Sequence, residues 1–162
     1  MENFTHYIIA NKNKSIFVFL VILSIVAIGL KVGLPNSACG KYYTKTISFG
    51  EKKLIVEVAD SDCKRMLGLS GRSSIRDEEG MLFDFENTGE HGFWMKGMQF
   101  PIDILWLDDN LKIVNIEKSL TPSTFPKIYG KNFISKYVLE VRSGLVDEIG
   151  IKVGNIISID KK

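Results

Sequence analysis

The chain has 162 residues, of which 45% are hydrophobic and 25% are charged, and its formal net charge is +2. This length allows one domain of ordinary size plus an accessory segment, and the composition excludes a wholly disordered chain. Residues 40–162 contain 18 basic and 18 acidic side chains without a strongly basic run. We therefore expect no nucleic-acid partner, because the electrostatic attraction that such binding needs is missing.

The first predicted element is an apolar segment at residues 16–34. Residues 16–30 carry no charged side chain, and Lys31 lies near the end of the segment. The whole segment, residues 16–34, has 19 residues, which is close to the roughly 20 that a helix needs to cross a bilayer. Lysine near such a helix end can extend its ammonium group to the interface. The predicted organisation is an N-terminal tail (1–15), a transmembrane anchor or signal segment (16–34), a linker (35–43) and a β-rich globular domain (44–162).

The fate of this segment has three alternatives. It can be a retained single-pass anchor, a cleaved signal peptide, or a lipoprotein signal with Cys39 lipidated. Small residues, Ser37 and Ala38, precede Cys39, which is typical of a signal-peptidase site. The lipoprotein alternative fits poorly, because Asn36 stands where such signals usually have an apolar residue. All three export the C-terminal domain from the cytoplasm, and the retained anchor predicts a single-pass membrane protein.

The domain begins with patterns typical of a hairpin and a short helix. Apolar and polar residues alternate at 44–49, and a β-branched run follows at 54–58, with Gly50 at the turn between them. A helix is predicted over 62–67, because Asp60 or Ser61 can cap its start and Gly68 can end it.

The remaining segments predict further strands and one more helix. Strands are expected at 81–85, 93–95, 101–107, 112–117, 137–141 and 156–159, and a short helix at 145–149 with Ser143 as its cap. Residues 120–136 show no sustained period, and loops of this length are often functional. Seven or eight short strands with two short helices predict a mainly β (β-rich α+β) fold, either a small barrel or a curled antiparallel sheet, after one N-terminal transmembrane helix.

Carboxylates within apolar strands are the first candidate functional residues. Asp103 has apolar neighbours on both faces of its predicted strand, so it should be partly buried and need N–H donors or a basic partner. Candidates for that partner are Arg65, Arg72, Lys96 and Arg142. Glu57 and Glu140 also lie within apolar strands. Asp103 and Glu140 would suit a glycosidase-type acid and base if the fold placed them a few ångströms apart, but structural ion pairing is the alternative.

Trp94 and Lys96 suggest a ligand-binding surface, because an exposed tryptophan offers stacking area beside one positive charge. Phe93 and Met95 are expected in the core. The predicted ligand-binding residues are Trp94, Lys96, Asp103 and Arg72, with Asp103 and Glu140 as catalytic candidates. We predict no metal and no cofactor, since two cysteines and one domain histidine match no zinc pattern and no phosphate loop is present. A Cys39–Cys63 disulfide is an alternative to two free thiols outside the cytoplasm.

An ordered set of short motifs resembles the family catalogued as domain of unknown function 192, also called UPF0127. The resemblance covers about residues 52–160, and its motifs are Val56–Asp60, Arg65 with Gly68-Leu69, Glu79–Phe83, Phe93–Lys96, Pro101–Ile104 and Tyr137–Glu140. It implies a compact β-rich domain, often preceded by a signal or membrane segment, with no established activity. The family pattern has Asn-Thr after the lysine of its Phe-Trp-Met-Lys motif, whereas this chain has Gly97-Met98.

These observations predict an exported, membrane-tethered module for ligand binding or envelope assembly. Its site would be a cleft around Trp94, Lys96, Asp103 and the 120–136 loop, and its partner an envelope glycan, a peptide or a membrane protein. The alternative is a carboxylate-dependent hydrolase acting on cell-envelope saccharide, with Asp103 and Glu140 as acid and base. A purely structural role in a membrane complex is the third hypothesis.

Overall fold

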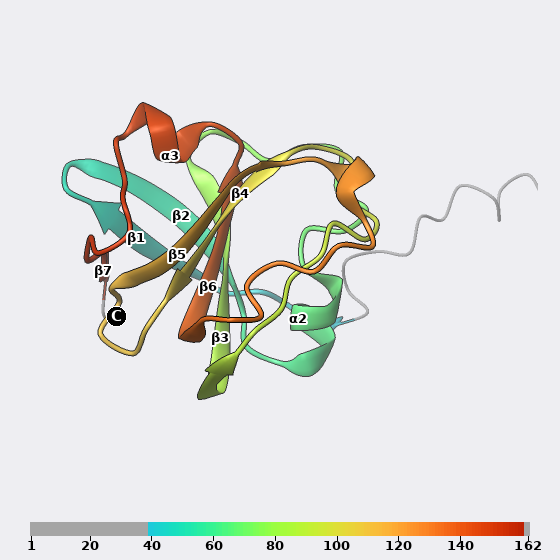
Figure 1. Ribbon diagram of the computed structural model, residues 1–162, viewed down its shortest axis with the longest axis horizontal. Helices are drawn as coiled ribbons and strands as arrows, with labels where there is room; N and C mark the ends of the chain where they lie inside the picture. Colours follow the sequence, from blue (N-terminus) through green and yellow to red (C-terminus); the bar gives the residue numbers. More distant parts are fainter. Residues whose placement is uncertain (1–38, 161–162) are drawn as a thin grey trace, which may run out of the picture. The chain divides into compact units, whose positions relative to one another are not determined.

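The computed structural model describes residues 39–160 (Figure 1). The predicted membrane segment at 16–34 lies outside these residues. Within the described part, no helix combines the length and the apolar character needed to cross a bilayer. Cys39 and Cys63 are both disulfide-bonded, so neither is a free thiol.

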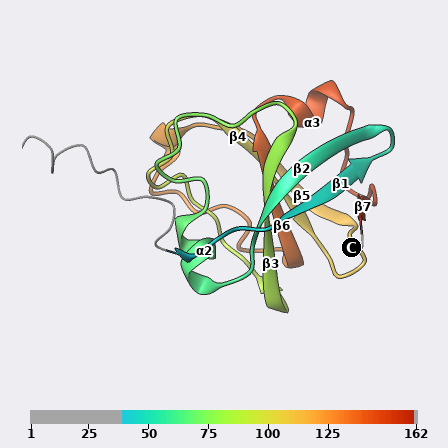
Figure 2. The same cartoon turned by 180° about the vertical axis from the view of Figure 1, so that it is seen from behind.

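Seven strands form one curled sheet, a half-barrel in the order β5-β4-β6-β3-β2-β1-β7. The strands are β1 (Thr44–Phe49), β2 (Lys52–Ala59), β3 (Glu79–Glu90), β4 (Ile102–Leu107), β5 (Ile113–Leu120), β6 (Ile134–Arg142) and β7 (Ser158–Ile159). The helices are α2 (Asp62–Leu67) and α3 (Leu145–Glu148), with a 3-10 turn η2 (Pro122–Thr124). Figures 1 and 2 show α2 and α3 at opposite ends of the twisted sheet. The predicted mainly β fold with two short helices is confirmed for this part of the chain.

The prediction of a wholly antiparallel sheet is wrong at one pair of strands. β2 and β3 run parallel, with Ile55 opposite Glu79 and Ala59 opposite Phe83. Parallel neighbours need a long crossover connection, and residues 60–78, which contain α2, provide it. This crossover places α2 against the sheet rather than at a hairpin turn.

The predicted strand at 93–95 is also wrong. The structure gives this segment a single bridge, between Phe93 and Tyr129, instead of a ladder. Gly97 follows with φ of 71°, so the chain turns away soon after Met95. The segment is therefore a loop held against the sheet by its side chains.

The two helices differ in how their N-terminal ends are capped. Only α2 has a capping side chain next to it in the sequence. The Ser61 hydroxyl accepts a hydrogen bond from the Lys64 N–H at 3.4 Å, and α2 ends at Gly68 with φ of 52°. The cap predicted at Ser143 is wrong, because Gly144 precedes α3 and makes no side-chain cap. The distant Asp103 carboxylate instead accepts the N–H of Val146 at 3.2 Å.

Two hydrophobic clusters cover opposite faces of the sheet, because neighbouring residues of a strand point to opposite sides. All six residues of β4 are buried. Leu105 and Leu107 belong to the cluster that includes α3, and we call this side the Leu105 face. Ile104 and Trp106 belong to the other cluster, which includes Phe83 and Met95, and we call that side the Trp106 face.

Candidate functional site

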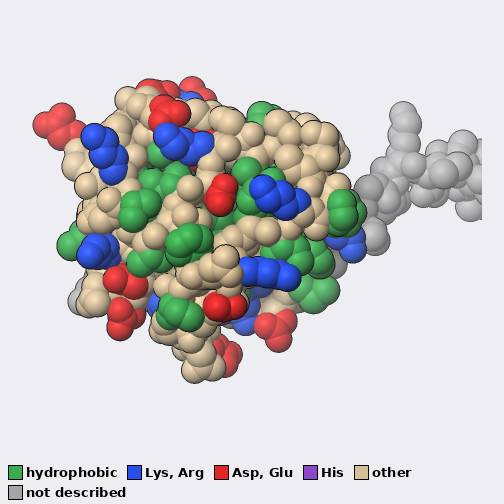
Figure 3. Space-filling model, in the orientation of Figure 1, with side chains coloured by type: hydrophobic (Ala, Val, Ile, Leu, Met, Phe, Trp, Pro, Cys, Tyr) green, Lys and Arg blue, Asp and Glu red, His purple; other side chains and the backbone are tan. Residues whose placement is uncertain are grey.

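A cleft of about 430 Å³ opens on the Trp106 face, between α2 with the residues that follow it and the 92–98 loop. Most of its lining side chains are apolar, namely Met66, Leu67, Leu69, Phe83, Phe85, Phe93, Trp94 and Met98. Figure 3 shows hydrophobic side chains at the surface of this end of the domain. A concave, mostly apolar site of this size with a few polar groups is typical of small-ligand binding.

Glu140 is the most unusual residue of the cleft lining. It lies near the C-terminal end of β6, opposite Met81 of β3 and Ile104 of β4, and is only 4% exposed. Its Oε2 atom has no hydrogen-bond partner among residues 39–160. Burial therefore raises the pKa of Glu140 to about 8, although the nearby positive charge of Arg72 acts in the opposite direction. At neutral pH the side chain is mostly an uncharged carboxylic acid.

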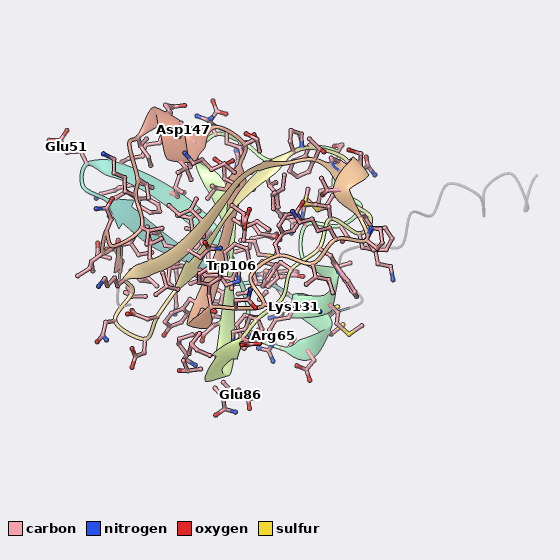
Figure 4. All side chains as sticks on the ribbon, viewed as in Figure 1. Glu51, Arg65, Glu86, Trp106, Lys131 and Asp147 are labelled. Atoms are coloured by element: carbon pink, nitrogen blue, oxygen red, sulfur yellow. The ribbon has the colours of Figure 1, made fainter. Side chains whose placement is uncertain are left out.

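The other polar side chains of the lining already have partners within the protein. The guanidinium of Arg65 donates to the carbonyl oxygen of Asp84 at 2.7 Å and to the carboxylate of Asp62 at 2.8 Å. The Ser70 hydroxyl donates to the carbonyl oxygen of Lys96 at 2.8 Å. Figure 4 labels Arg65 beside α2, at this end of the domain. Among residues 39–160, the Glu140 carboxyl is therefore the buried polar group of the lining that has no partner.

Arg72 influences the cleft from outside its lining. The strand register places Glu57, Met81 and Glu140 in one row across β2, β3 and β6. Arg72 forms its ion pair with Glu57 and not with Asp103. Its charge reaches Glu140, where it favours the ionised carboxylate. The predicted ligand-binding residue Arg72 thus acts on the site electrostatically.

Asp103 lies on the Leu105 face and therefore away from the cleft. It pairs with Val141, the neighbour of Glu140, so the two carboxylates project from opposite faces of the sheet. Asp103 is fully buried, and its carboxylate accepts the N–H of Ser119 at 2.8 Å and that of Val146 at 3.2 Å. The predicted N–H donors are confirmed.

The proposed acid and base pair of Asp103 and Glu140 is ruled out by this register, since a strand pair cannot turn both carboxyl groups into one cleft. Asp103 is also excluded from the predicted ligand site, because its oxygens face the other hydrophobic cluster. Among residues 39–160, no three His, Cys, Asp or Glu side chains come together in a group that could hold a metal ion.

Trp94 lines the cleft mouth, as the predicted ligand surface requires. Its side chain is 50% exposed, and the ring of Phe125 packs against it at 6.3 Å between centroids. Phe125 belongs to the long 120–136 loop, so this loop does reach the site. The Lys96 ammonium lies 5.6 Å from the Trp94 ring centroid, outside the cleft lining. Phe93 and Met95 pack into the Trp106-face cluster as predicted.

The cleft itself was missed by sequence reasoning, because its walls and floor are far apart along the chain. Residues 65–70, which form the end of α2 and the turn after it, line the cleft with Glu140 because β2 and β3 pair in parallel. One local signal was available. Gly68 ends α2 beside the carboxyl, and a Cβ atom at this position would lie 3.3 Å from the Phe83 ring and 4.0 Å from Glu140 Oε2.

Comparisons with known proteins agree on the family and leave its activity open. The model of the DUF192 family, described as "Uncharacterized ACR", matches residues 44–159. A UPF0127 protein of Thermococcus gammatolerans is 29% identical over 105 residues, which is 65% of this chain and 66% of that relative's length.

Two solved structures share the fold. A Sinorhizobium meliloti protein, described as a candidate transcription regulator, has a TM-score of 0.69 and 28% identity, over 74% of this chain and 95% of that one. A Novosphingobium aromaticivorans protein of unknown function has a TM-score of 0.66 and 25% identity, over 76% and 89% of the two chains. The motifs, the curled sheet and the family match over residues 44–159 together establish that this chain belongs to the DUF192 (UPF0127) family.

Proposed function

We propose that this chain is an exported, membrane-tethered ligand-binding module whose ligand occupies the cleft above Glu140. One observation carries the binding function: the lining of an apolar cleft of about 430 Å³ includes a buried carboxyl oxygen that has no hydrogen-bond partner among residues 39–160. The tether rests on the uncharged run at residues 16–30.

The apolar lining of the cleft favours an apolar ligand over a saccharide. A saccharide carries many hydroxyl groups, and each of them would need a partner on leaving water. Glu140 is the one buried polar group of the lining without a partner among residues 39–160, so an envelope glycan fits the cleft poorly. An apolar peptide side chain, or a small molecule of similar character, can instead fill the space between Phe83, Phe93 and Trp94.

Binding can be measured with three small probes that share one apolar body. They are 3-(4-fluorophenyl)propanamide, the corresponding propylamine and the corresponding propanoate. The full-length chain in lipid nanodiscs is titrated with each probe by fluorine NMR, and empty nanodiscs correct for partition into lipid. At least one probe should bind saturably.

Variants then locate the binding. Trp94→Ala should weaken the best probe about tenfold, because truncating a contacting aromatic side chain commonly costs more than 1 kcal/mol. The matched control is Ile156→Ala, which removes an exposed apolar side chain outside the cleft. Probes that bind equally well to the two variants would contradict the assignment to this cleft.

A second candidate function is assembly with a membrane-protein partner, and exposed apolar side chains at the cleft mouth favour it. Met66 is 84% exposed, Trp94 50% and Phe125 44%. Co-purification from detergent extracts of the native membrane would test this role. A partner whose recovery survives replacement of Met66 and Phe125 by serine would speak against this surface.

A further inference from the structure

We propose, on the basis of the ligand-binding function above, that the cleft selects an uncharged apolar ligand whose one buried polar group is an amide paired with the Glu140 side chain. The geometry provides access. Gly68 has no side chain and lies above the carboxyl, where even a Cβ atom would come within 4.0 Å of Oε2 and 3.3 Å of Phe83. Glu140 is itself one of the residues that line the cleft, so a ligand group in the cleft would meet the acid from this side.

The lining limits the ligand to one buried polar group. Arg65 and Ser70 already donate to protein oxygen atoms, Asp62 accepts from Arg65, and the other lining side chains apart from Glu140 are apolar or aromatic. A buried polar group without a partner is costly, so a second one on the ligand would weaken binding. The rest of the ligand must be hydrocarbon or aromatic to match Phe83, Phe93 and Trp94.

The charges around Glu140 favour an uncharged ligand. From α2, Arg65 and Asp62 face the cleft as a pair at 2.8 Å. From the connection after α2, Arg72 brings a positive charge that is paired with Glu57 on β2. A cationic ligand would be repelled by Arg72, and any ion would have to leave water for an apolar cleft.

An amide matches the carboxylic acid in both of its hydrogen-bonding roles. An uncharged carboxyl group has one O–H donor and one carbonyl acceptor, and an amide has a carbonyl acceptor and an N–H donor. The two can form paired hydrogen bonds. Burial supports this state of Glu140, because it raises the pKa of the carboxyl to about 8.

The test uses the same probes on the full-length chain in nanodiscs, at pH 6.5 and pH 9.5. The variants are Glu140→Gln, which keeps a donor and an acceptor without titrating, and Glu140→Met, which keeps the volume without a strong hydrogen bond. Glu51→Gln is the matched control for lost charge, because Glu51 is exposed at the β1–β2 turn, far from α2 (Figure 4). Circular dichroism confirms that each variant is folded.

The amide should bind the wild-type chain about tenfold more tightly than the amine and the propanoate at pH 6.5, as expected for one or two net hydrogen bonds. At pH 9.5 its affinity should fall by up to about tenfold, the loss expected for Glu140→Met, because a carboxyl with a pKa of about 8 is then mostly ionised and has lost its O–H donor. Glu140→Gln should bind the amide equally at both pH values, and Glu140→Met should lose about tenfold. Glu51→Gln should behave as wild type.

Two results would overturn the inference and leave the binding function intact. The amine could bind most tightly and lose its affinity in Glu140→Gln, which would define a cation site. Alternatively, Glu140→Met could bind the amide as well as wild type does, which would show that the acid does not recognise the ligand. Binding that ignores Trp94→Ala would overturn the proposed function itself, and this inference with it.

Discussion

Replacing Glu140 by glutamine should stabilise the folded domain by an amount that grows with pH. Burial raises the pKa of this carboxyl from 4.5 to about 8. Below pH 4.5 the side chain is protonated in both the folded and the unfolded chain, so it contributes no pH-dependent difference. Between about pH 4.5 and 8 the unfolded chain releases the proton while the folded domain retains it. The free energy of unfolding therefore falls as pH rises through this range.

The magnitude follows from the size of the pKa change. One unit is worth about 1.4 kcal/mol, so wild type should have lost about 1 kcal/mol at pH 5, about 3 kcal/mol at pH 7 and about 4 kcal/mol at pH 8, where the folded group is half ionised. Glutamine has a similar shape and cannot ionise. Relative to wild type, Glu140→Gln should gain stability by the same amounts, apart from a constant offset from its own hydrogen bonding.

Urea denaturation of the full-length chain in nanodiscs, followed by circular dichroism at pH 5, 6, 7 and 8, measures this difference. Glu51→Gln removes the same charge from an exposed turn and should track wild type throughout. A difference between wild type and Glu140→Gln that stays constant from pH 5 to pH 8 would refute the reasoning. It would mean that Glu140 is ionised in the folded domain.

Three further predictions concern other residues of the domain. Asp103→Ala should cost about 2–4 kcal/mol in the free energy of unfolding, because the N–H groups of Ser119 and Val146 lose their acceptor. Asp103→Asn keeps one acceptor oxygen and should cost less, and urea denaturation distinguishes the two variants. Gly130→Ala should lower the free energy of unfolding by several kcal/mol, since its Cβ would lie 2.2 Å from the Trp106 ring. The Cβ of Gly144→Ala would meet no atom within 4 Å, so this variant should cost only about 1 kcal/mol of backbone strain. Thermal unfolding compares the two variants. Burial lowers the pKa of His91, whose ring stacks on Phe85 at 3.5 Å between centroids, so its NMR titration midpoint should lie below 6.5 and move upward in Phe85→Ala.

Local patterns in the sequence were sufficient for the hairpins and for α2. The alternation at 44–49 and 54–58 corresponds to β1 and β2, and the predicted hairpin at 101–117 corresponds to β4 and β5. The caps of α2 at Ser61 and Gly68 are equally local. In each case the signal lies within the few residues that make the structure.

The candidate site depended on register, which the sequence patterns did not contain. Asp103 and Glu140 both stand in apolar strands, and whether they meet is decided by their pairing across β4 and β6. Because Asp103 lies opposite Val141, the two acids are separated by the sheet. A shift of one residue would have placed them on the same face. The parallel pairing of β2 with β3 was equally inaccessible, since its partners are about 24 residues apart in the chain.

The central position of β6 has a consequence for how the protein matures. β6 joins a β1–β2–β3 half, extended by β7, to the β4–β5 hairpin, and it also supplies Glu140. A nascent or truncated chain that stops before residue 134 would hold two disconnected pieces of sheet and no floor under α2. Such a fragment would expose the apolar edges of β3 and β4, which makes it prone to aggregation. The cleft is therefore completed late, with the last long strand.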